Sequence, residues 1–287
     1  MTEKNASTKK AEPARIGRHN VERVLITGAS AGIGADLARE FARHGHKLAL
    51  VARRQEMLAK LSAELSESFG VDVMTVPGDL AKSSGPKAVV EALDAAGEQV
   101  DILVNNAGVI DVGPFAASQT EKLVNLVNLN VVALTHLTSL LLPRMVERKF
   151  GRILNVASLA AFQPIPSMAA YAASKAFVLS LTEALSEELS GTDVKVSALC
   201  PGLTDTAMVA EIKDRSGSAR GVPAGLISDP KDVARQAYRA LISGQVVLVP
   251  GIPNQMAAAW AQVTPHWILR SFTGFASRYS GWTRGGR

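Results

Sequence analysis

The segment Val24-Leu25-Ile26-Thr27-Gly28-Ala29-Ser30-Ala31-Gly32-Ile33-Gly34 decides the fold of this 287-residue chain. Its first three residues form the short apolar run that is typical of a buried parallel strand, and an amphipathic helical pattern follows the glycines. Gly28, Gly32 and Gly34 permit a tight turn, a close approach to a pyrophosphate and close packing of the helix on the strand. The free N–H groups of the first helical turn also suit a phosphate. A glycine-rich turn without a ligand is the alternative, and the strand–glycine–helix context argues against it.

Apolar strand-like runs recur along the whole chain, with helical patterns between them. These runs cover residues 23–27, 47–52, 72–76, 100–104, 151–156, 194–199 and 245–249. The alternation predicts right-handed βαβ units and therefore an α/β fold, a Rossmann-type, doubly wound, seven-stranded parallel sheet flanked by helices. The ligand crevice of such a fold opens at the carboxyl ends of its strands.

A second motif lies in the other half of the chain. Tyr171 and Lys175 stand four residues apart in a helical pattern, and Ser158 follows a strand-like run thirteen residues before the tyrosine. Positions i and i+4 share a helix face, so we expect the Lys175 ammonium beside the Tyr171 phenol, where it favours the ionised form. The phenol could then donate and accept a proton. Because Tyr-x-x-x-Lys is common by chance, its weight depends on the other motifs.

Together these motifs resemble those of the classical short-chain dehydrogenases/reductases, and the resemblance covers about residues 21–250. Thr27–Gly34 resembles the cofactor glycine motif of that family, and Asn105-Asn106-Ala107-Gly108 resembles its central NNAG element. Pro201–Thr206 resembles the segment that holds the nicotinamide end of the cofactor. The motifs occur in the order and spacing of the family, so its fold and activity become expectations for this chain.

The resemblance implies an oxidoreductase that interconverts a ketone and a secondary alcohol. Tyr171 would exchange a proton with the substrate oxygen, Ser158 would polarise that oxygen, and Lys175 would lower the tyrosine pKa and bind the nicotinamide ribose. Asn130 resembles the asparagine that holds a water for proton relay, with Asn128 as the competing assignment. The predicted cofactor contacts, in which Asp79 would meet the adenine with Leu80 beside it, are Gly28, Ser30, Gly32, Ile33, Gly34, Arg53, Asp79, Leu80, Asn106, Ala107, Gly108, Tyr171, Lys175, Pro201, Gly202, Thr204 and Thr206.

The end of the second predicted strand informs the choice of cofactor. It reads Leu50-Val51-Ala52-Arg53-Arg54 and carries no carboxylate. NAD-binding folds commonly place Asp or Glu there to hold the ribose 2′-hydroxyl, whereas a guanidinium can bind a 2′-phosphate. We therefore predict NADP(H), with NAD(H) as the less favoured cofactor. Arg53 is the preferred phosphate ligand, with Ser30 as a second contact, and Arg54 could instead be a solvated residue that starts the next helix.

Composition and charge narrow the partners. Hydrophobic residues make up 47% and charged residues 20% of the chain, as in ordinary globular α/β domains. The net charge of +5 comes from the ends, since residues 1–20 carry +3 and residues 270–287 carry +4, which leaves −2 for the body. Without a basic stripe on the body, we expect no nucleic-acid partner. The five histidines form no cluster with acidic or thiol residues, so we predict no metal site.

The pattern of apolar residues bears on localisation. Polar residues, Pro or Gly interrupt the apolar stretches before the roughly eighteen residues of a membrane span, and the first twenty residues lack a signal-peptide core. The single cysteine, Cys200, precludes an intramolecular disulfide and is expected to be buried. These observations predict a cytoplasmic protein.

The residues expected around the outer cleft are nearly all apolar, and no Arg or Lys stands ready to grip a small carboxylate. They are Val109, Phe115, Leu159, Phe162, Pro164, Met168, Leu203 and Met208. A hydrophobic small-molecule substrate, such as a 3-oxoacyl, steroid-like or other apolar carbonyl compound, fits this set. The alternative function is a non-catalytic dinucleotide-binding regulatory or scaffold protein, against which the intact Ser158, Tyr171 and Lys175 argue.

The expected domain organisation is a flexible tail over residues 1–20, a dinucleotide-binding catalytic domain over 21–250 with a substrate lid at about 204–226, and an aromatic and basic extension over 251–287. Six of the fourteen aromatic residues and all three tryptophans lie within residues 260–287. We expect Trp260, Trp267, Ile268 and Phe272 to pack on the same or a neighbouring subunit, with weak membrane-surface contact as the alternative. The apolar character of more than one face of residues 169–185 predicts a homodimer or homotetramer.

Overall fold

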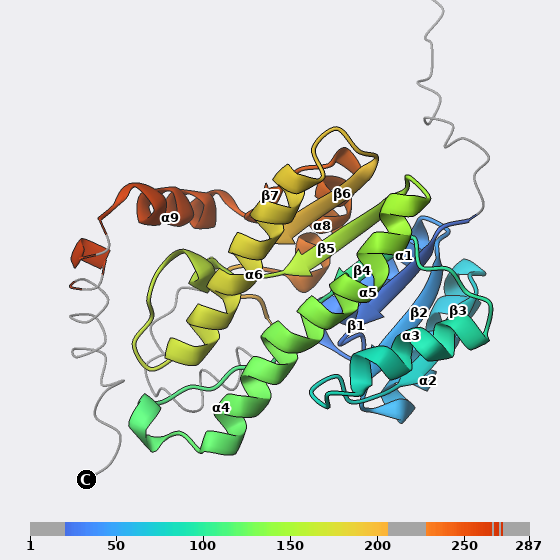
Figure 1. Cartoon of the computed structure of the whole chain (residues 1–287), viewed down its shortest axis with the longest axis horizontal. Helices are drawn as coiled ribbons and strands as arrows, with labels where there is room; N and C mark the ends of the chain where they lie inside the picture. The colour runs from blue at the N-terminus through green and yellow to red at the C-terminus, as the bar shows by residue number, and fades with distance from the viewer. Residues whose placement is uncertain (1–20, 206–227, 266, 270, 272–287) are drawn as a thin grey trace, which may run out of the picture.

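A single parallel sheet of seven strands, in the order β3-β2-β1-β4-β5-β6-β7, runs through the protein (Figure 1). The computed structural model describes residues 21–205, 228–265, 267–269 and 271. The strands are β1 (Arg23–Thr27), β2 (Lys47–Ala52), β3 (Val73–Pro77), β4 (Ile102–Asn105), β5 (Gly151–Val156), β6 (Val194–Leu199) and β7 (Val247–Leu248). The order reverses between β1 and β4, which confirms the expected doubly wound fold. In such sheets ligands bind outside the carboxyl ends of the strands at this reversal.

Helices cover both faces of the sheet. The α-helices in the described residues are α1 (Gly32–Arg43), α2 (Gln55–Phe69), α3 (Gly85–Ala95), α4 (Thr120–Val127), α5 (Leu134–Glu147), α6 (Ala169–Glu188), α8 (Pro230–Ser243) and α9 (Ile252–Val263). The short elements η1 (Phe115–Ala117) and η3 (Leu159–Phe162) are 3-10 helices, and η2 (Asn128–Ala133) is a π-helix.

The core divides into two layers because successive side chains of a strand point to opposite faces of the sheet. Val24 and Ile26 of β1 join a buried cluster with residues of α1, α2 and α8. Leu25, which stands between them, joins a second cluster with residues of α3 and α5. Near-continuous apolar strands such as β1 are therefore required, since both faces are covered.

The predicted strand boundaries are correct for β1, β2, β5 and β6 and shift by one or two residues elsewhere. The largest difference is β7, which was expected over residues 245–249 but comprises only Val247 and Leu248. This edge strand pairs only with β6, through Ala198 and Leu199. Pro250 follows two residues later and has no N–H to extend the pairing.

One helical run, Thr120–Glu147, is long and apolar enough by length and composition to span a membrane. The sequence analysis did not single out this segment, because polar residues such as Asn125, Asn128 and His136 interrupt its apolar ones. Pro143 lies within α5 without ending it. The run comprises α4, η2 and α5, and its buried residues include Leu134, Leu137 and Leu141. In the folded domain α5 packs on α3, β4 and β5, so this run is a core element of the fold.

Candidate active site

The glycine loop between β1 and α1 is shaped by a close approach to the end of β4. Gly28 and Gly32 have φ values of +66° and +56°, in the left-handed region that favours glycine. A Cβ added at Gly28 would lie 2.9 Å from Asn106 Nδ2, and one added at Gly34 would collide with both Asn106 Nδ2 and the Gly28 carbonyl oxygen. Asn106 Nδ2 donates to the carbonyl oxygens of Thr27, at 2.9 Å, and Gly28, at 3.2 Å. These two hydrogen bonds fix the backbone of the loop, which leads directly into α1.

Thr27 is the second connection between β1 and β4, and the sequence analysis assigned it no role beyond its place in the glycine motif. Its Oγ1 donates to the Val104 carbonyl at 3.2 Å and accepts the backbone N–H groups of Asn106 at 2.9 Å and Ala107 at 3.0 Å. The side chain is 1% exposed. Its position directly before Gly28, at the end of a buried strand, was the available signal.

The end of β2 presents two adjacent arginines, Arg53 and Arg54, both exposed. Arg54 Nη2 donates to Ser30 Oγ at 3.0 Å, whereas no hydrogen bond or ion pair of Arg53 occurs within the described part of the chain. Arg54, rather than the preferred Arg53, therefore contacts Ser30, the other residue predicted to bind the 2′-phosphate. The reason is local, since Arg54 is the N-cap residue of α2 and its side chain reaches back to the glycine loop.

The catalytic candidates meet beyond the end of β5. Ser158 caps η3, and its Oγ accepts the Ala160 N–H at 3.1 Å. Helix α6 places Tyr171 so that it forms a hydrogen bond with Ser158. Lys175, one turn further along α6, donates from Nζ to the Val156 carbonyl at 2.8 Å and lies 5.8 Å from the centroid of the Tyr171 ring. The structure therefore brings Ser158, Tyr171 and Lys175 together.

Burial dominates the electrostatics of this group. Tyr171 is 7% exposed, and burial raises the pKa of its phenol above the ordinary value, while the hydrogen bond with Ser158 opposes that shift. Lys175 is 5% exposed, and burial lowers the pKa of its ammonium to about 8. The sequence predicted that Lys175 would lower the tyrosine pKa. In this structure the ammonium instead binds Val156, and desolvation is the largest influence on both groups.

Asn130 lies in the π-helical turn η2 and is 1% exposed. Its Oδ1 accepts the Val109 N–H and its Nδ2 donates to the Val109 carbonyl, both at 2.9 Å, and Nδ2 also donates to Ser174 Oγ at 3.1 Å. A Cβ added at Gly108 would lie 3.2 Å from Asn130 Oδ1 and 3.5 Å from Lys175 Nζ. Asn130 thus joins the residue after the NNAG element to α6. Its place in a π-helical turn fits a functional role, because such turns are frequent at functional sites.

The remaining predicted contacts take less central positions. Asn128 is half-buried at the start of η2, so the geometry favours Asn130 over it. Asp79 Oδ1 accepts the Ala81 N–H at 3.1 Å in the turn after β3, and Leu80 is a core residue. Ile33 is partly buried and packs against the core beneath α1.

The segment after β6 lies beside the serine. The Pro201 carbonyl accepts the Leu159 N–H at 2.9 Å, and a Cβ added at Gly202 would lie 2.6 Å from Asn254 Nδ2. Thr204 is 3% exposed, and its Oγ1 donates to the Gly202 carbonyl at 3.3 Å. The predicted contact Thr206, the lining residue Met208 and most of the expected lid lie outside the described residues.

Tyr171 belongs to an apolar cluster, not to a polar cavity. The cluster comprises Val112, Leu126, Ala160, Met168, Tyr171 and Ala172, with Val109, Ile110, Ile165 and Ala170 packed against it. Val109 and Met168, which were predicted to line the cleft, both belong to this apolar cluster or pack against it. Phe162 instead packs with the cluster around Cys200, and Phe115 is 61% exposed.

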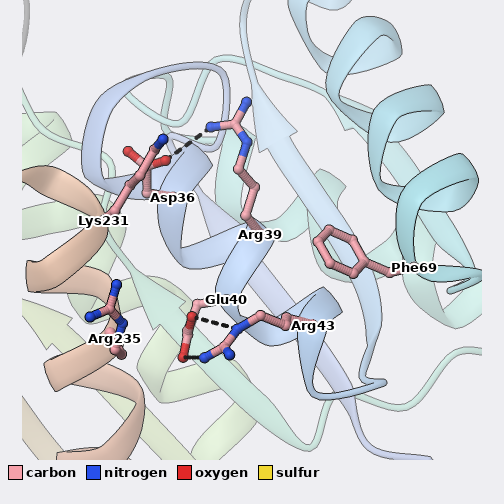
Figure 2. A pocket seen from close by; sticks show the side chains of 7 residues that line it. All are labelled: Asp36, Arg39, Glu40, Arg43, Phe69, Lys231 and Arg235. Carbon is pink, nitrogen blue, oxygen red and sulfur yellow. Dashed lines mark hydrogen bonds and ion pairs between the residues drawn. The ribbon is translucent and has the colours of Figure 1, made fainter.

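A separate hollow of about 340 Å³ lies between α1, α2 and α8 (Figure 2). Its charged side chains are largely paired with one another or with neighbours: Arg39 with Asp36 and Glu64, and Arg43 with Glu40. None of the predicted site residues lines it. The hollow is therefore a solvated junction between helices rather than a second part of the site.

Residues 22–217 match the family described as short chain dehydrogenase. The chain belongs to the short-chain dehydrogenase family. It is 35% identical over 219 residues to the ketoacyl reductase HetN of Nostoc sp., and the alignment covers 76% of this chain and 74% of that protein. It is 34% identical over 260 residues to a very-long-chain 3-oxoacyl-CoA reductase of Pyrenophora tritici-repentis, with 87% and 71% covered. The solved structure of a short-chain dehydrogenase from Sphingobium yanoikuyae in complex with NADPH aligns with a TM-score of 0.72 and 34% identity over 89% of this chain and 95% of that one.

As a short-chain dehydrogenase, the protein is an oxidoreductase that acts on a carbonyl group or the corresponding CH–OH group. Its loop geometry fits the dinucleotide of that family. The glycines at 28 and 34 leave no room for a Cβ, and α1 begins at Gly32 within the same loop, so the free N–H groups of its first turn suit a phosphate. Gly28, Gly32, Gly34 and the NNAG backbone would hold the cofactor at this edge of the sheet.

A buried polar chain beneath the site was missed by the sequence analysis. Asn155 of β5 is fully buried, accepts from Asn105 Nδ2 at 2.9 Å and donates to Thr182 Oγ1 at 3.0 Å. Asn105 Nδ2 also donates to Thr138 Oγ1 at 3.1 Å. These bonds tie β4 and β5 to α5 and α6, and so position the short-chain dehydrogenase serine and tyrosine relative to each other. A polar residue between the apolar residues Leu154 and Val156 of β5 was the signal.

The burial of Lys175 in this short-chain dehydrogenase predicts a pH-dependent contribution to stability. Because its folded pKa is about 8, below the ordinary 10.5, the unfolded chain binds more protons between these values, and stability rises with pH there. Relative to Lys175→Met, the wild-type free energy of unfolding should rise by about 2 kcal/mol between about pH 7.5 and about pH 9.5. Urea denaturation measures it, with the exposed Lys60→Met on α2 as control. A difference that stays constant with pH would mean that the ammonium is not buried as described.

Proposed function

We propose that this short-chain dehydrogenase is an NADP(H)-dependent reductase of apolar ketones, and that it oxidises the corresponding secondary alcohols in reverse. The observation that carries the proposal is the Tyr171 hydroxyl, hydrogen-bonded to Ser158 within an apolar cluster and one helical turn from a buried ammonium. A hydroxyl pair beside an apolar cluster suits a carbonyl oxygen, since it offers donors where negative charge develops.

The side chains divide the chemistry between them. When bound, NADPH supplies the hydride. Tyr171 donates its phenolic proton to the substrate oxygen, and Ser158 donates a hydrogen bond to the same oxygen. The Lys175 ammonium favours the phenolate that remains, by Coulomb attraction at low dielectric, and can return a proton to it. Asn130 positions the NNAG backbone against α6, through Val109 and Ser174.

The substrate class follows from the apolar surroundings of Tyr171. The cluster of Val112, Leu126 and Met168 offers no cation to a small carboxylate, so a ketone carried on an apolar chain fits better than a 2-oxo acid. Two relatives are named for reducing 3-oxoacyl or ketoacyl compounds. A 3-oxoacyl thioester is therefore our first choice of substrate class, with bulkier apolar ketones next.

Assembly through α4, η2 and α6 accompanies this proposal. Val124, Val127 and Val132 on α4 and η2 are between 43% and 52% exposed, and Phe177 on α6 is 41% exposed. Helix α6 packs beside both α4 and η2, so these side chains share one region of the surface. We propose that a second subunit covers them in a homodimer.

The cofactor preference rests on Arg54, Ser30 and Arg53. Arg54→Ala should weaken NADPH binding about 10- to 100-fold, since a hydrogen bond to a charged group contributes about 1.5–3 kcal/mol. NADH, which lacks the 2′-phosphate, should bind wild type and variant alike. Fluorescence titration of both cofactors measures the dissociation constants, with Arg235→Ala on α8 as the matched control.

The Arg53→Ala variant and the Arg53→Ala/Arg54→Ala double variant show how much each arginine contributes to NADPH binding. A preference lost only when both arginines are replaced would make them joint phosphate ligands. If the wild type binds NADH as tightly as NADPH, or if the double variant keeps the NADPH preference, the 2′-phosphate assignment is wrong. The carbonyl chemistry at Tyr171 would be unaffected by that result.

A further inference from the structure

Helix α9 carries an apolar stripe that faces solvent. Ile252, Met256, Trp260 and Val263 are 72%, 69%, 44% and 81% exposed, and we call these four side chains the α9 face. At about 100° per residue they fall within about 80° of the helix circumference. The opposite side of α9 is anchored, since Ala258 and Ala261 are buried.

The exposure of the α9 face is unusual for this molecule. Outside the region from α9 onward, the most exposed large apolar side chain among the described residues is Phe115, at 61%. Trp267, just beyond the end of α9, is 65% exposed, while Leu269, two residues later, is fully buried. We expected Trp267 to pack on the same or a neighbouring subunit, and its exposure shows that it does not pack within its own subunit.

The charge of the surrounding sequence indicates what the face contacts. From Gly251 to the C-terminus the sequence contains no Asp or Glu, and it contains Arg270, Arg278, Arg284 and Arg287. A stripe of large apolar side chains next to an acid-free basic segment suits the interface of an anionic bilayer, where rings sit at the headgroups and cations meet lipid phosphate. On a two-fold axis between copies, the same feature would place two basic segments against each other.

The position of α9 relative to the active site adds a functional reason. Helix α9 lies at the edge of the molecule beyond α6 and away from α1–α3 (Figure 1), and it packs on η3, the element that Ser158 caps. Asn254 of α9 also lies against Gly202, in the segment that resembles the nicotinamide-binding motif. A surface that docks through α9 would therefore lie next to the substrate end of the cleft.

We infer that the α9 face docks peripherally on an anionic lipid bilayer and inserts its apolar side chains at headgroup level. The docking itself does not depend on the proposed NADP(H) chemistry. If that chemistry is also correct, the arrangement brings the cleft to apolar carbonyl compounds held in the membrane.

The tryptophans provide the probe for the test. All three, Trp260, Trp267 and Trp282, lie in α9 or beyond it, so the tryptophan emission of the full chain reports on this region alone. Vesicles of phosphatidylcholine with about one-third phosphatidylglycerol should shift the emission to shorter wavelength and sediment the protein. Vesicles of pure phosphatidylcholine should bind at least about tenfold less, and added salt should reduce binding to the anionic vesicles.

A matched pair of triple variants tests the residues. Ile252→Ser/Met256→Ser/Val263→Ser should lower the partition coefficient for anionic vesicles at least about tenfold, since each change removes apolar area from the contact. The control, with three exposed apolar residues changed on other helices, should bind as the wild type does: Met57→Ser/Phe69→Ser/Ile242→Ser. Both should retain cofactor binding, which shows that they fold.

Two results would overturn the inference. One is a wild-type chain that neither sediments with anionic vesicles nor changes its emission. The other is an α9 variant that keeps wild-type vesicle binding. If the α9 variant instead changes the oligomer mass in light scattering while wild-type protein ignores vesicles, the face is a contact between copies of the chain and the bilayer assignment is wrong.

Discussion

Replacing Tyr171 by Phe should lower kcat for ketone reduction about 10²- to 10⁴-fold, which is the range for loss of a positioned general acid. The change removes one oxygen and leaves the ring within the apolar cluster, so the dissociation constant for NADPH and the thermal midpoint should change little. Steady-state kinetics and cofactor titration on the same preparation separate these quantities.

Tyr238→Phe is the control, because Tyr238 is also buried and also uses its hydroxyl, with His46 Nε2 at 3.2 Å, away from the predicted site. It should keep near wild-type kcat even if it loses stability. A Tyr171→Phe enzyme with more than about a tenth of wild-type kcat would show that another group donates the proton.

The second large effect is expected at the glycine loop. Gly34→Ala places a Cβ against the Gly28 carbonyl and Asn106 Nδ2, and neither can move without breaking the bonds that join β1 to β4. We expect a loss of about 1–3 kcal/mol in the free energy of unfolding, as for other overpacked sites, and NADPH binding weakened beyond detection.

Gly78→Ala is the matched control, since a Cβ there meets only Val89 Cγ2, at 3.9 Å. Urea denaturation and cofactor titration of the two variants give both effects. If Gly34→Ala binds NADPH as wild type does, the loop does not form the dinucleotide cradle that its geometry suggests.

The sequence was sufficient for the sheet because its signals are local. The strand–glycine–helix unit at β1 and the apolar runs at β2, β5 and β6 each carry their own periodicity. The sequence favoured Arg53 over Arg54, but it could not show that the Arg54 side chain reaches back from the start of α2 to Ser30. Two neighbouring arginines have the same chemistry, so only the three-dimensional structure shows which of them contacts Ser30.

The electrostatics of the site depended on contacts that are distant in sequence. The i, i+4 rule correctly placed Lys175 near Tyr171, but the depth of burial of both groups is set by α4, η2 and η3 packing around α6. The pKa of the phenol therefore shifts in the opposite direction to the one expected from the lysine alone. The α9 face, in contrast, was not identified from the sequence, although its helical spacing is present there, and its exposure needed the structure.

The most direct test of the proposed chemistry follows a labelled hydride. Wild-type enzyme is incubated with a medium-chain 3-oxoacyl thioester and NADPH deuterated at both C4 positions, and the product alcohol is analysed by mass spectrometry. We predict an alcohol with one deuterium on the carbinol carbon, formed at a rate that Tyr171→Phe lowers about 10²- to 10⁴-fold. NADPH that binds tightly while no labelled alcohol forms from this thioester or from bulkier apolar ketones would contradict the account and favour a dinucleotide-binding protein without turnover.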